Sequence, residues 1–152
     1  MSHIPADLTD VYRHVESTAP HEGCGVVFRR ADGGFRAVPM QNVYDKYAAR
    51  DPARFPRSSH TAYKMNELEL ARLIEQAEGQ GETLTCIFHS HVDVGAYFSK
   101  EDKDMAAPPP DHQPAWPNVA WLVIAVDGGR ATGHKLFVFK SGDFVEAPTK
   151  QP

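Results

Sequence analysis

TLTCIFHSHVDVGAYFSKED, residues 83–102, is the segment from which both the fold and the chemistry of this chain can be inferred. Its first part, Thr83 to Phe88, is an uninterrupted and mainly apolar run of residues, which predicts a buried strand. His89 and His91 follow directly. Alternate residues of a strand point to the same side, so both imidazoles project toward one point if the strand continues through them.

Asp102 is the third residue of interest in this segment. It lies eleven residues after His91, far enough for the intervening loop to turn back and place a carboxylate over the two rings. Imidazole nitrogen and carboxylate oxygen both bind zinc, and three protein ligands leave a fourth tetrahedral position for water, which is typical of a catalytic site. His89, His91 and Asp102 are therefore candidate metal ligands.

The run Ser99-Lys100-Glu101-Asp102 has a second interpretation. It resembles a capping box, in which Ser99 is the N-cap of a short helix and an acid follows three residues later. The two interpretations are compatible, because the start of a helix is a rigid place to hold a ligand.

The sequence on both sides of this segment predicts further helices and strands. Apolar residues spaced by three or four indicate helices at 8–15 and 70–77, and a short helix is expected at 103–107. Strands are expected at 26–28, 35–40, 83–88, 121–126 and 135–139. Residues 42–60 are expected to be a long irregular loop, of a kind that is usually functional or disordered. This order indicates the α+β class, with helices packed on one mixed or antiparallel sheet.

Length and composition exclude several classes of protein. The 152 residues suit one domain, which we expect over residues 1–147, followed by a disordered tail at 148–152. A net charge of −4 with scattered Lys and Arg argues against nucleic-acid binding, and no apolar run reaches the roughly 18 residues that a membrane span needs. Cys24 and Cys86 are too few for a disulfide framework, and the N-terminus lacks a signal-peptide pattern. We therefore expect a cytoplasmic protein with both thiols reduced.

The whole pattern resembles a known signature. His-Ser-His, seven residues, Ser, two residues and Asp, with a Glu upstream, is similar to the JAMM signature of the MPN-domain zinc metallopeptidases. The matching positions are His89, His91, Ser99, Asp102 and the upstream Glu22. Residues 20–25, Pro-His-Glu-Gly-Cys-Gly, are similar to a block in the bacterial members, and Asn42, Asp51-Pro52 and Arg54-Phe55 are weaker similarities to the same subgroup. The resemblance implies a single-domain MPN-like fold, which is layered like that of cytidine deaminases.

The same resemblance implies the chemistry. It assigns one Zn²⁺ per chain to His89, His91 and Asp102, the proton shuttle to Glu22, and a hydrogen bond to the tetrahedral oxyanion to Ser99. Members of the family cleave ubiquitin or ubiquitin-like proteins from lysines, or release an amino acid or peptide from a ubiquitin-like sulfur carrier. The short chain and the bacterial-type blocks favour cleavage of an amide or isopeptide bond after the Gly-Gly tail of a ubiquitin-like or sulfur-carrier protein, which would be the protein partner.

Three other functions are compatible with parts of the sequence. A non-catalytic MPN scaffold would be expected to lack at least one signature position, and this chain lacks none. A cysteine hydrolase could be built on Cys24, although a small thiol beside glycines is more often a packed residue. A related bacterial domain linked to DNA repair has Asn between its histidines, where this chain has Ser90.

The expected loop at 42–60 mixes cationic and aromatic side chains. Such a mixture suits contact with an acidic or mixed protein surface beside the active site, while the alternative is an ordinary solvated loop. The residues concerned are Arg50, Arg54, Arg57, Tyr44, Tyr47 and Phe55.

Overall fold

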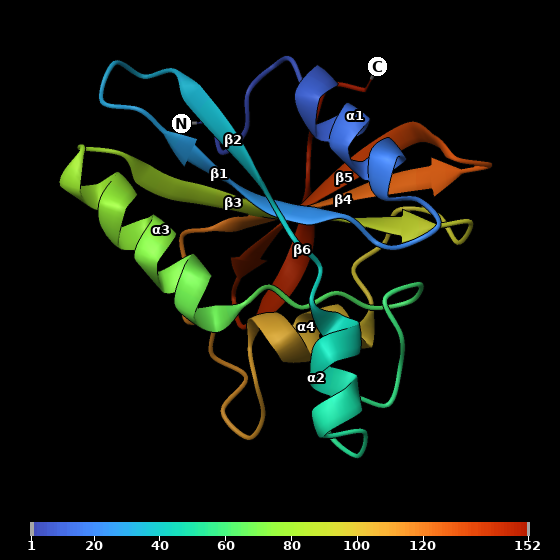
Figure 1. Ribbon diagram of the computed structural model, residues 1–152. Coiled ribbons are helices and arrows are strands. Elements are labelled where there is room, and N and C mark those ends of the chain that lie inside the picture. Colours follow the sequence, from blue (N-terminus) through green and yellow to red (C-terminus); the bar gives the residue numbers. More distant parts are fainter. Residues whose placement is uncertain (1, 152) are drawn as a thin grey trace.

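The computed structural model describes residues 2–151, and in this range the chain forms four helices and six strands (Figure 1). In chain order the elements are α1 (Thr9–Thr18), β1 (Cys24–Arg29), β2 (Phe35–Met40), α2 (Tyr44–Arg50), α3 (Glu67–Gly79), β3 (Thr83–Val92), α4 (Lys100–Ala106), β4 (Ala120–Asp127), β5 (Arg130–Lys140) and β6 (Asp143–Ala147). None of these helices has the length and apolar character needed to cross a bilayer.

All six strands belong to one sheet, in the order β2-β1-β3-β4-β5-β6. Every neighbouring pair is antiparallel except β3 and β4, which are parallel. The predicted α+β class is therefore confirmed, and of the two sheet types considered the mixed one is correct. The predicted strand at 83–88 is part of β3, which lies inside the sheet and is buried along nearly all its length.

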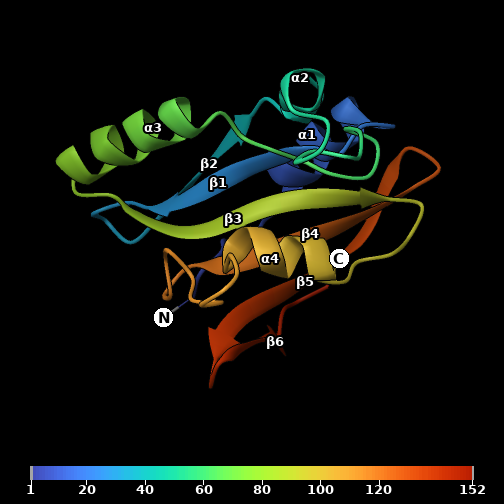
Figure 2. The ribbon, with the colours of Figure 1, turned by 90° about the horizontal axis from the view of Figure 1, so that it is seen from below.

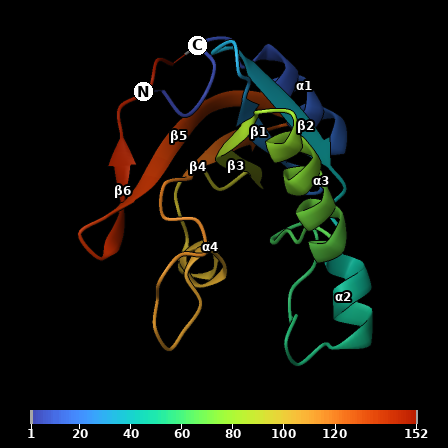
Figure 3. The same cartoon turned by 90° about the vertical axis from the view of Figure 1, so that its left-hand side faces the viewer.

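The two faces of the sheet are covered by different helices. Val11 and Val15 of α1 pack with Phe88 on one face, while Ile87 belongs to the apolar cluster on the other face, with residues of α3 and α4. Figures 2 and 3 show α1 and α4 on opposite sides of the sheet. Because side chains alternate along a strand, His89 and His91 share the face of Ile87. Both imidazoles of β3 therefore point to the face of the sheet that α4 covers.

Gly25 shows how closely the layers meet beside these histidines. A Cβ atom at this position would lie 2.4 Å from both the Phe88 ring and the carbonyl oxygen of Val38. No side chain fits there without moving backbone, so glycine is required where β1 passes between β2 and β3.

The structure departs from the sequence prediction in two elements. Residues 42–60 were expected to be irregular, but Tyr44–Arg50 form α2, in which Tyr44 and Tyr47 each pack edge-on against Phe55. These aromatic side chains therefore pack against each other within the segment. The edge strand β6 was not predicted. The predicted domain boundary at residue 147 coincides with the end of β6. The single-domain extent and the disorder of residues 148–152 stay predictions, and residues 1 and 152 lie outside the described range.

Candidate metal centre

The two histidines of β3 form the base of the site. The strand continues through both residues to Val92, so their side chains leave the sheet on one face. Their Nε2 atoms are 3.2 Å apart. Both side chains are buried, with 0% of His89 and 4% of His91 exposed.

Asp102 reaches the histidines from the first turn of α4. Its Oδ1 lies 3.2 Å from His89 Nε2, and its Oδ2 lies 3.2 Å from His91 Nε2. Its orientation is set by a capping box with Ser99. The Asp102 N–H donates to Ser99 Oγ, and the Ser99 N–H donates to Asp102 Oδ2, each at 3.0 Å. The capping box predicted at residues 99–102 is therefore present, and the same carboxylate lies beside the two imidazole rings.

Glu22 is brought to the same place by the register of β1 on β3. Cys24 pairs with His89 in this antiparallel ladder, and continuing it by two residues places Glu22 opposite His91. Ser90 fixes the approach, because its Oγ accepts from Gly23 N–H at 2.8 Å and its own N–H donates to the Gly23 carbonyl at 3.0 Å. One donor atom each of Glu22, His89 and His91 lie within 4.8 Å of one another. Two overlapping sets, one with Glu22 and one with Asp102, could thus contribute to a metal site.

The geometry of the histidines and Asp102 fits a zinc ion. His91 Nδ1 lies 3.2 Å from the carbonyl oxygen of Gly95, where it can donate, so the Nε2 lone pair is left facing Asp102. The two Nε2 atoms are 3.2 Å apart, and each lies 3.2 Å from a different oxygen of the Asp102 carboxylate. Ligand atoms at about 2.0–2.1 Å from a tetrahedral zinc are roughly 3.3–3.4 Å apart. A cation of this size would relieve the crowding of electron-rich atoms.

The protonation states also suit a metal. Burial acts to raise the pKa of the Asp102 carboxyl, but its contacts with His89 and His91 outweigh this and hold the pKa well below its usual range. Burial lowers the pKa of His89. The lowered pKa of each group favours the deprotonated form that a metal ligand must adopt. In contrast, burial and, to a smaller extent, the charge of Asp102 raise the pKa of Glu22 to about 9.

Each imidazole is held by an aromatic ring that was not predicted from the sequence. Tyr63 stacks on His89 with ring centroids 4.4 Å apart, and Tyr97 packs edge-on against His91 at 4.8 Å. Tyr97 lies between His91 and Ser99 in the sequence, and this position could have indicated that it is close to the site. Tyr63 comes from a distant and irregular part of the chain, and nothing in its neighbourhood marked it.

A hydrogen-bonded network behind the site holds the backbone of Glu22. Its N–H donates to the carbonyl of Ser59 at 2.7 Å, and its carbonyl accepts from Asn42 Nδ2 at 2.9 Å. Ser59 in turn donates from its Oγ, at 2.6 Å, and from its N–H, at 2.9 Å, to the carboxylate of Asp45. The segment expected to be a loop therefore supplies the support of the predicted proton shuttle.

Two pockets lie beside the metal centre. The first, here called the polar pocket, has a volume of about 130 Å³, and Glu22, His91, Ser99, Arg57 and Glu101 are among its lining residues. Ser99 is thus on the same cavity as Glu22, as its predicted role requires.

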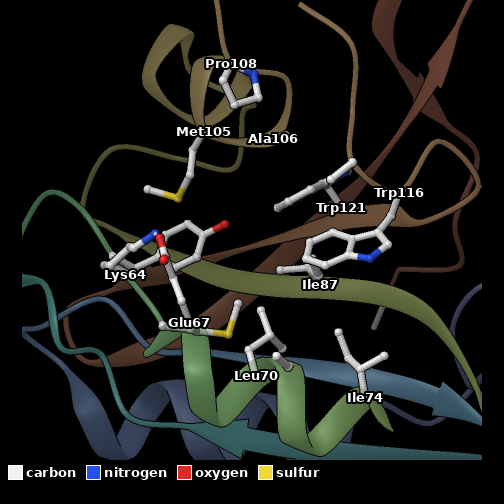
Figure 4. Close-up of a pocket in the computed structure, with 14 residues that line it drawn as sticks. Lys64, Glu67, Leu70, Ile74, Ile87, Met105, Ala106, Pro108, Trp116 and Trp121 are labelled. Atoms are coloured by element: carbon white, nitrogen blue, oxygen red, sulfur yellow. The ribbon is translucent and has the colours of Figure 1, made fainter. Parts of the chain in front are cut away.

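The second, here called the apolar pocket, has a volume of about 310 Å³ and lies between α3 and α4 over the sheet (Figure 4). Leu70 and Ile74 line it from α3, Met105 lines it from α4, and Trp116 closes one side. Tyr63 lines it as well and stacks on His89, so the apolar pocket adjoins the metal centre.

The two thiols do not belong to a reactive site. Cys24 and Cys86 are free and fully buried. Burial, with a smaller effect of Glu22, raises the pKa of the Cys24 thiol to about 12, and burial also raises that of Cys86. Since the thiolate is the nucleophilic form, neither residue is suited to attack a substrate.

Comparison with known proteins gives a consistent picture. The model of the family described as prokaryotic homologs of the JAB domain matches residues 6–138. The chain is 30% identical over 112 residues to the CysO-cysteine peptidase of Mycobacterium tuberculosis, a match that covers 72% of this chain and 68% of that protein. The CysO-cysteine peptidase of Mycobacterium bovis matches with the same identity and coverage.

Two solved structures support the fold. A protein from Desulfitobacterium hafniense is similar with a TM-score of 0.62 and 21% identity, covering 92% of this chain and 84% of that one. A protein from Salinibacter ruber is similar with a TM-score of 0.60 and 20% identity, covering 100% of this chain and 92% of that one. At these identities the likeness shows the fold alone.

Proposed function

The chain belongs to the family of prokaryotic homologs of the JAB domain, and from this membership and the site we propose that it is a zinc-dependent hydrolase. Its reaction is the cleavage of the amide bond after the Gly-Gly tail of a ubiquitin-like or sulfur-carrier protein. The observation that carries the proposal is the meeting of His89, His91 and Asp102 at 3.2 Å, with the buried carboxyl of Glu22 beside them.

Three side chains would hold the ion, His89 and His91 through Nε2 and Asp102 through its carboxylate. Zinc bound there would supply a Lewis acid and would lower the pKa of a water molecule from 15.7 to about 7. Glu22 then remains free for proton transfer, because the other three residues already complete a catalytic donor set.

Glu22 acts as the proton shuttle. Its carboxylate accepts a proton from the attacking water and delivers it to the nitrogen of the leaving group. Burial in the polar pocket favours the protonated carboxyl, which makes Glu22 a good proton acceptor. A nearby cation favours the ionised form that must begin the cycle. Hydrogen bonds with Ser59 and Asn42 hold the backbone of Glu22, from which the carboxyl is presented to the pocket.

Ser99 stabilises the oxyanion. Its Oγ accepts the capping bond from the Asp102 N–H, so its own hydroxyl hydrogen is free to point into the polar pocket. Donors of this kind typically contribute about 10²–10³ in rate. The single hydroxyl thus has two roles, one in holding α4 and one in catalysis.

Several features favour a carrier tail as the substrate. The relatives in Mycobacterium are named for the removal of cysteine from a protein called CysO. Glycines bring no side chain between the substrate backbone and the metal-binding atoms. A Gly-Gly tail can therefore enter a site in which the side chains of Glu22, His89, His91 and Asp102 are all buried. The apolar pocket beside Tyr63 can accept an apolar side chain from the tail before the glycines.

A direct test uses a carrier whose Gly-Gly tail is joined through an amide bond to one amino acid. Zinc-loaded protein should release the amino acid, chelation should abolish release, and zinc should restore it. Mass spectrometry of the carrier reports cleavage after the second glycine. A zinc-loaded, folded protein that releases nothing from any such adduct would favour the non-catalytic scaffold instead.

A further inference from the structure

Arg57 has a position in the polar pocket that the proposed reaction has not yet used. Among the residues that line this pocket, Arg57 is the one lysine or arginine. Its backbone N–H donates to the hydroxyl of Tyr44 at 3.2 Å, and its guanidinium donates to the carbonyl of Thr61 at 3.3 Å. The backbone of Arg57 is therefore anchored by Tyr44, and its guanidinium is held at the pocket by Thr61.

The polar pocket is lined by Glu22, the proposed proton shuttle. Glu22 must come within reach of the leaving nitrogen in order to protonate it. Groups that share this small cavity with Glu22 are therefore within reach of what is attached to that nitrogen. At about 130 Å³ the cavity suits a single small residue and not the folded surface of a second protein.

A carboxylate already pairs with Arg57 at this place. The Glu101 Oε1 lies 2.8 Å from a guanidinium nitrogen of Arg57, and the two side chains are 54% and 42% exposed. Exposed ion pairs contribute little to stability, so another carboxylate can replace Glu101 at small cost. Arginine is well suited to bind a second carboxylate in place of Glu101, because its planar guanidinium group binds carboxylates through two parallel hydrogen bonds.

From this arrangement we infer that Arg57 binds the free α-carboxylate of the leaving amino acid. The inference rests on the proposed hydrolase activity and names a residue that selects, among its substrates, carrier tails that end in one added amino acid with a free carboxylate. In such a substrate one carbon separates the scissile nitrogen from the carboxylate. A lysine side-chain linkage places four methylenes and a folded protein there instead.

The reaction balances with water as the only co-reactant. Water adds to the carbonyl of the second glycine and the C–N bond breaks. The tail then ends in a carboxylate, and the nitrogen of the released amino acid gains the proton carried by Glu22. Arg57 takes no part in bond breaking and acts as a specificity-determining residue.

The test compares two peptides that end in Gly-Gly-Ala, one with a free acid and one with an amide at the C-terminus. Their dissociation constants are measured by NMR titration on zinc-loaded Glu22→Gln protein, so that neither peptide is consumed. We expect the acid to bind about tenfold more tightly, as for one charge-assisted hydrogen bond. In Glu22→Gln/Arg57→Gln protein the ratio should fall to near one.

Three further variants serve as matched controls. Arg54→Gln changes an arginine of the same segment that stacks on Phe55 and is not among the lining residues, so it should keep the tenfold ratio. Glu101→Gln removes the competing carboxylate and should keep or increase it. His60→Gln changes the exposed imidazole that lines the same pocket and should also keep the ratio. A ratio that survives Arg57→Gln, or that is lost in His60→Gln or Glu101→Gln instead, overturns the assignment.

Activity measurements separate this inference from the proposed function. If wild-type, zinc-loaded protein cleaves neither peptide but prefers the acid through Arg57, the hydrolase proposal fails while the carboxylate site stands. If it cleaves both with equal kcat/KM and equal affinity, the hydrolase stands and the Arg57 assignment is wrong.

Discussion

Ser99 and Asp102 hydrogen-bond to each other reciprocally at the start of α4, and the same Asp102 carboxylate lies 3.2 Å from both histidines of β3. The N-cap of a helix is therefore also a support of the metal centre. In the proposed mechanism, helix stability and catalysis both depend on this pair of residues, and substitutions can separate the two contributions.

The double role of Ser99 predicts different results for two substitutions. Ser99→Ala removes the cap and should cost about 1 kcal/mol of stability, whereas Ser99→Gly should cost only a few tenths. Both remove the proposed oxyanion donor, so both should lose about 10²–10³ in kcat. Thermal unfolding and steady-state kinetics on zinc-loaded protein check this. A Ser99→Gly enzyme with full activity would leave Ser99 with the capping role alone.

The two overlapping donor sets can be distinguished by zinc content. If His89, His91 and Asp102 are the ligands, elemental analysis should give near one zinc per chain in wild-type protein and in Glu22→Gln. Metal affinity should fall sharply in His89→Ala and in Asp102→Asn, because a site with three protein ligands binds zinc much more weakly when one of them is removed. Zinc retained by Asp102→Asn but lost by Glu22→Gln would assign the third ligand to Glu22.

Much of the fold was predictable because it follows local periodicity. The strand at 35–40 and the helix at 70–77 lie in elements whose apolar spacing is regular. The edge strand β6 was missed because Phe144 is its only buried residue, so the five-residue segment carries no alternation. The helix α2 was missed because it is only seven residues long, it carries several charges, and the contacts of Tyr44 and Tyr47 with Phe55 form only in the folded chain.

The candidate site was predictable only where its residues lie in one segment. His89, His91, Ser99 and Asp102 share a strand, a turn and a helix start, so their spacing carries the information. Glu22 came from the resemblance to a family signature. The contacts of Asn42 and Ser59 with Glu22 join residues 20 and 37 positions apart, and they depend on how the segment after β2 folds back. No local pattern records such tertiary contacts.

The buried thiols predict insensitivity to alkylation. With a pKa of about 12, Cys24 carries almost no thiolate near neutral pH, so iodoacetamide should leave activity intact while a chelator abolishes it. Cys24→Ala should keep kcat within a few-fold and lose about 1 kcal/mol of stability through a small cavity. Loss of activity in a folded, zinc-loaded Cys24→Ala protein would revive the cysteine-hydrolase alternative.

Asp45 predicts a pH dependence of stability. Hydrogen bonds from Ser59 lower its pKa below the ordinary 3.8. The stabilisation is therefore fully present above that value and is lost as pH falls through the lower pKa of the folded state. Because the Asp45 carboxylate is exposed and screened by solvent, Asp45→Ala should reduce Tm by only about 1–2 °C at pH 7. In thermal scans, the difference in Tm between wild type and Asp45→Ala should become smaller below about pH 4. A difference in Tm that does not change with pH would contradict this.

The central claim is that Glu22 moves the proton while zinc is held by other residues. The most direct measurement compares wild-type and Glu22→Gln proteins, matched in zinc content and Tm, on a carrier whose tail ends in Gly-Gly and one amino acid. Mass spectrometry should show cleavage after the second glycine by the wild type. With Glu22→Gln, the rate should fall by about 10²–10⁴, the usual contribution of a general base. A zinc-loaded Glu22→Gln protein that cleaves at the wild-type rate would contradict the account.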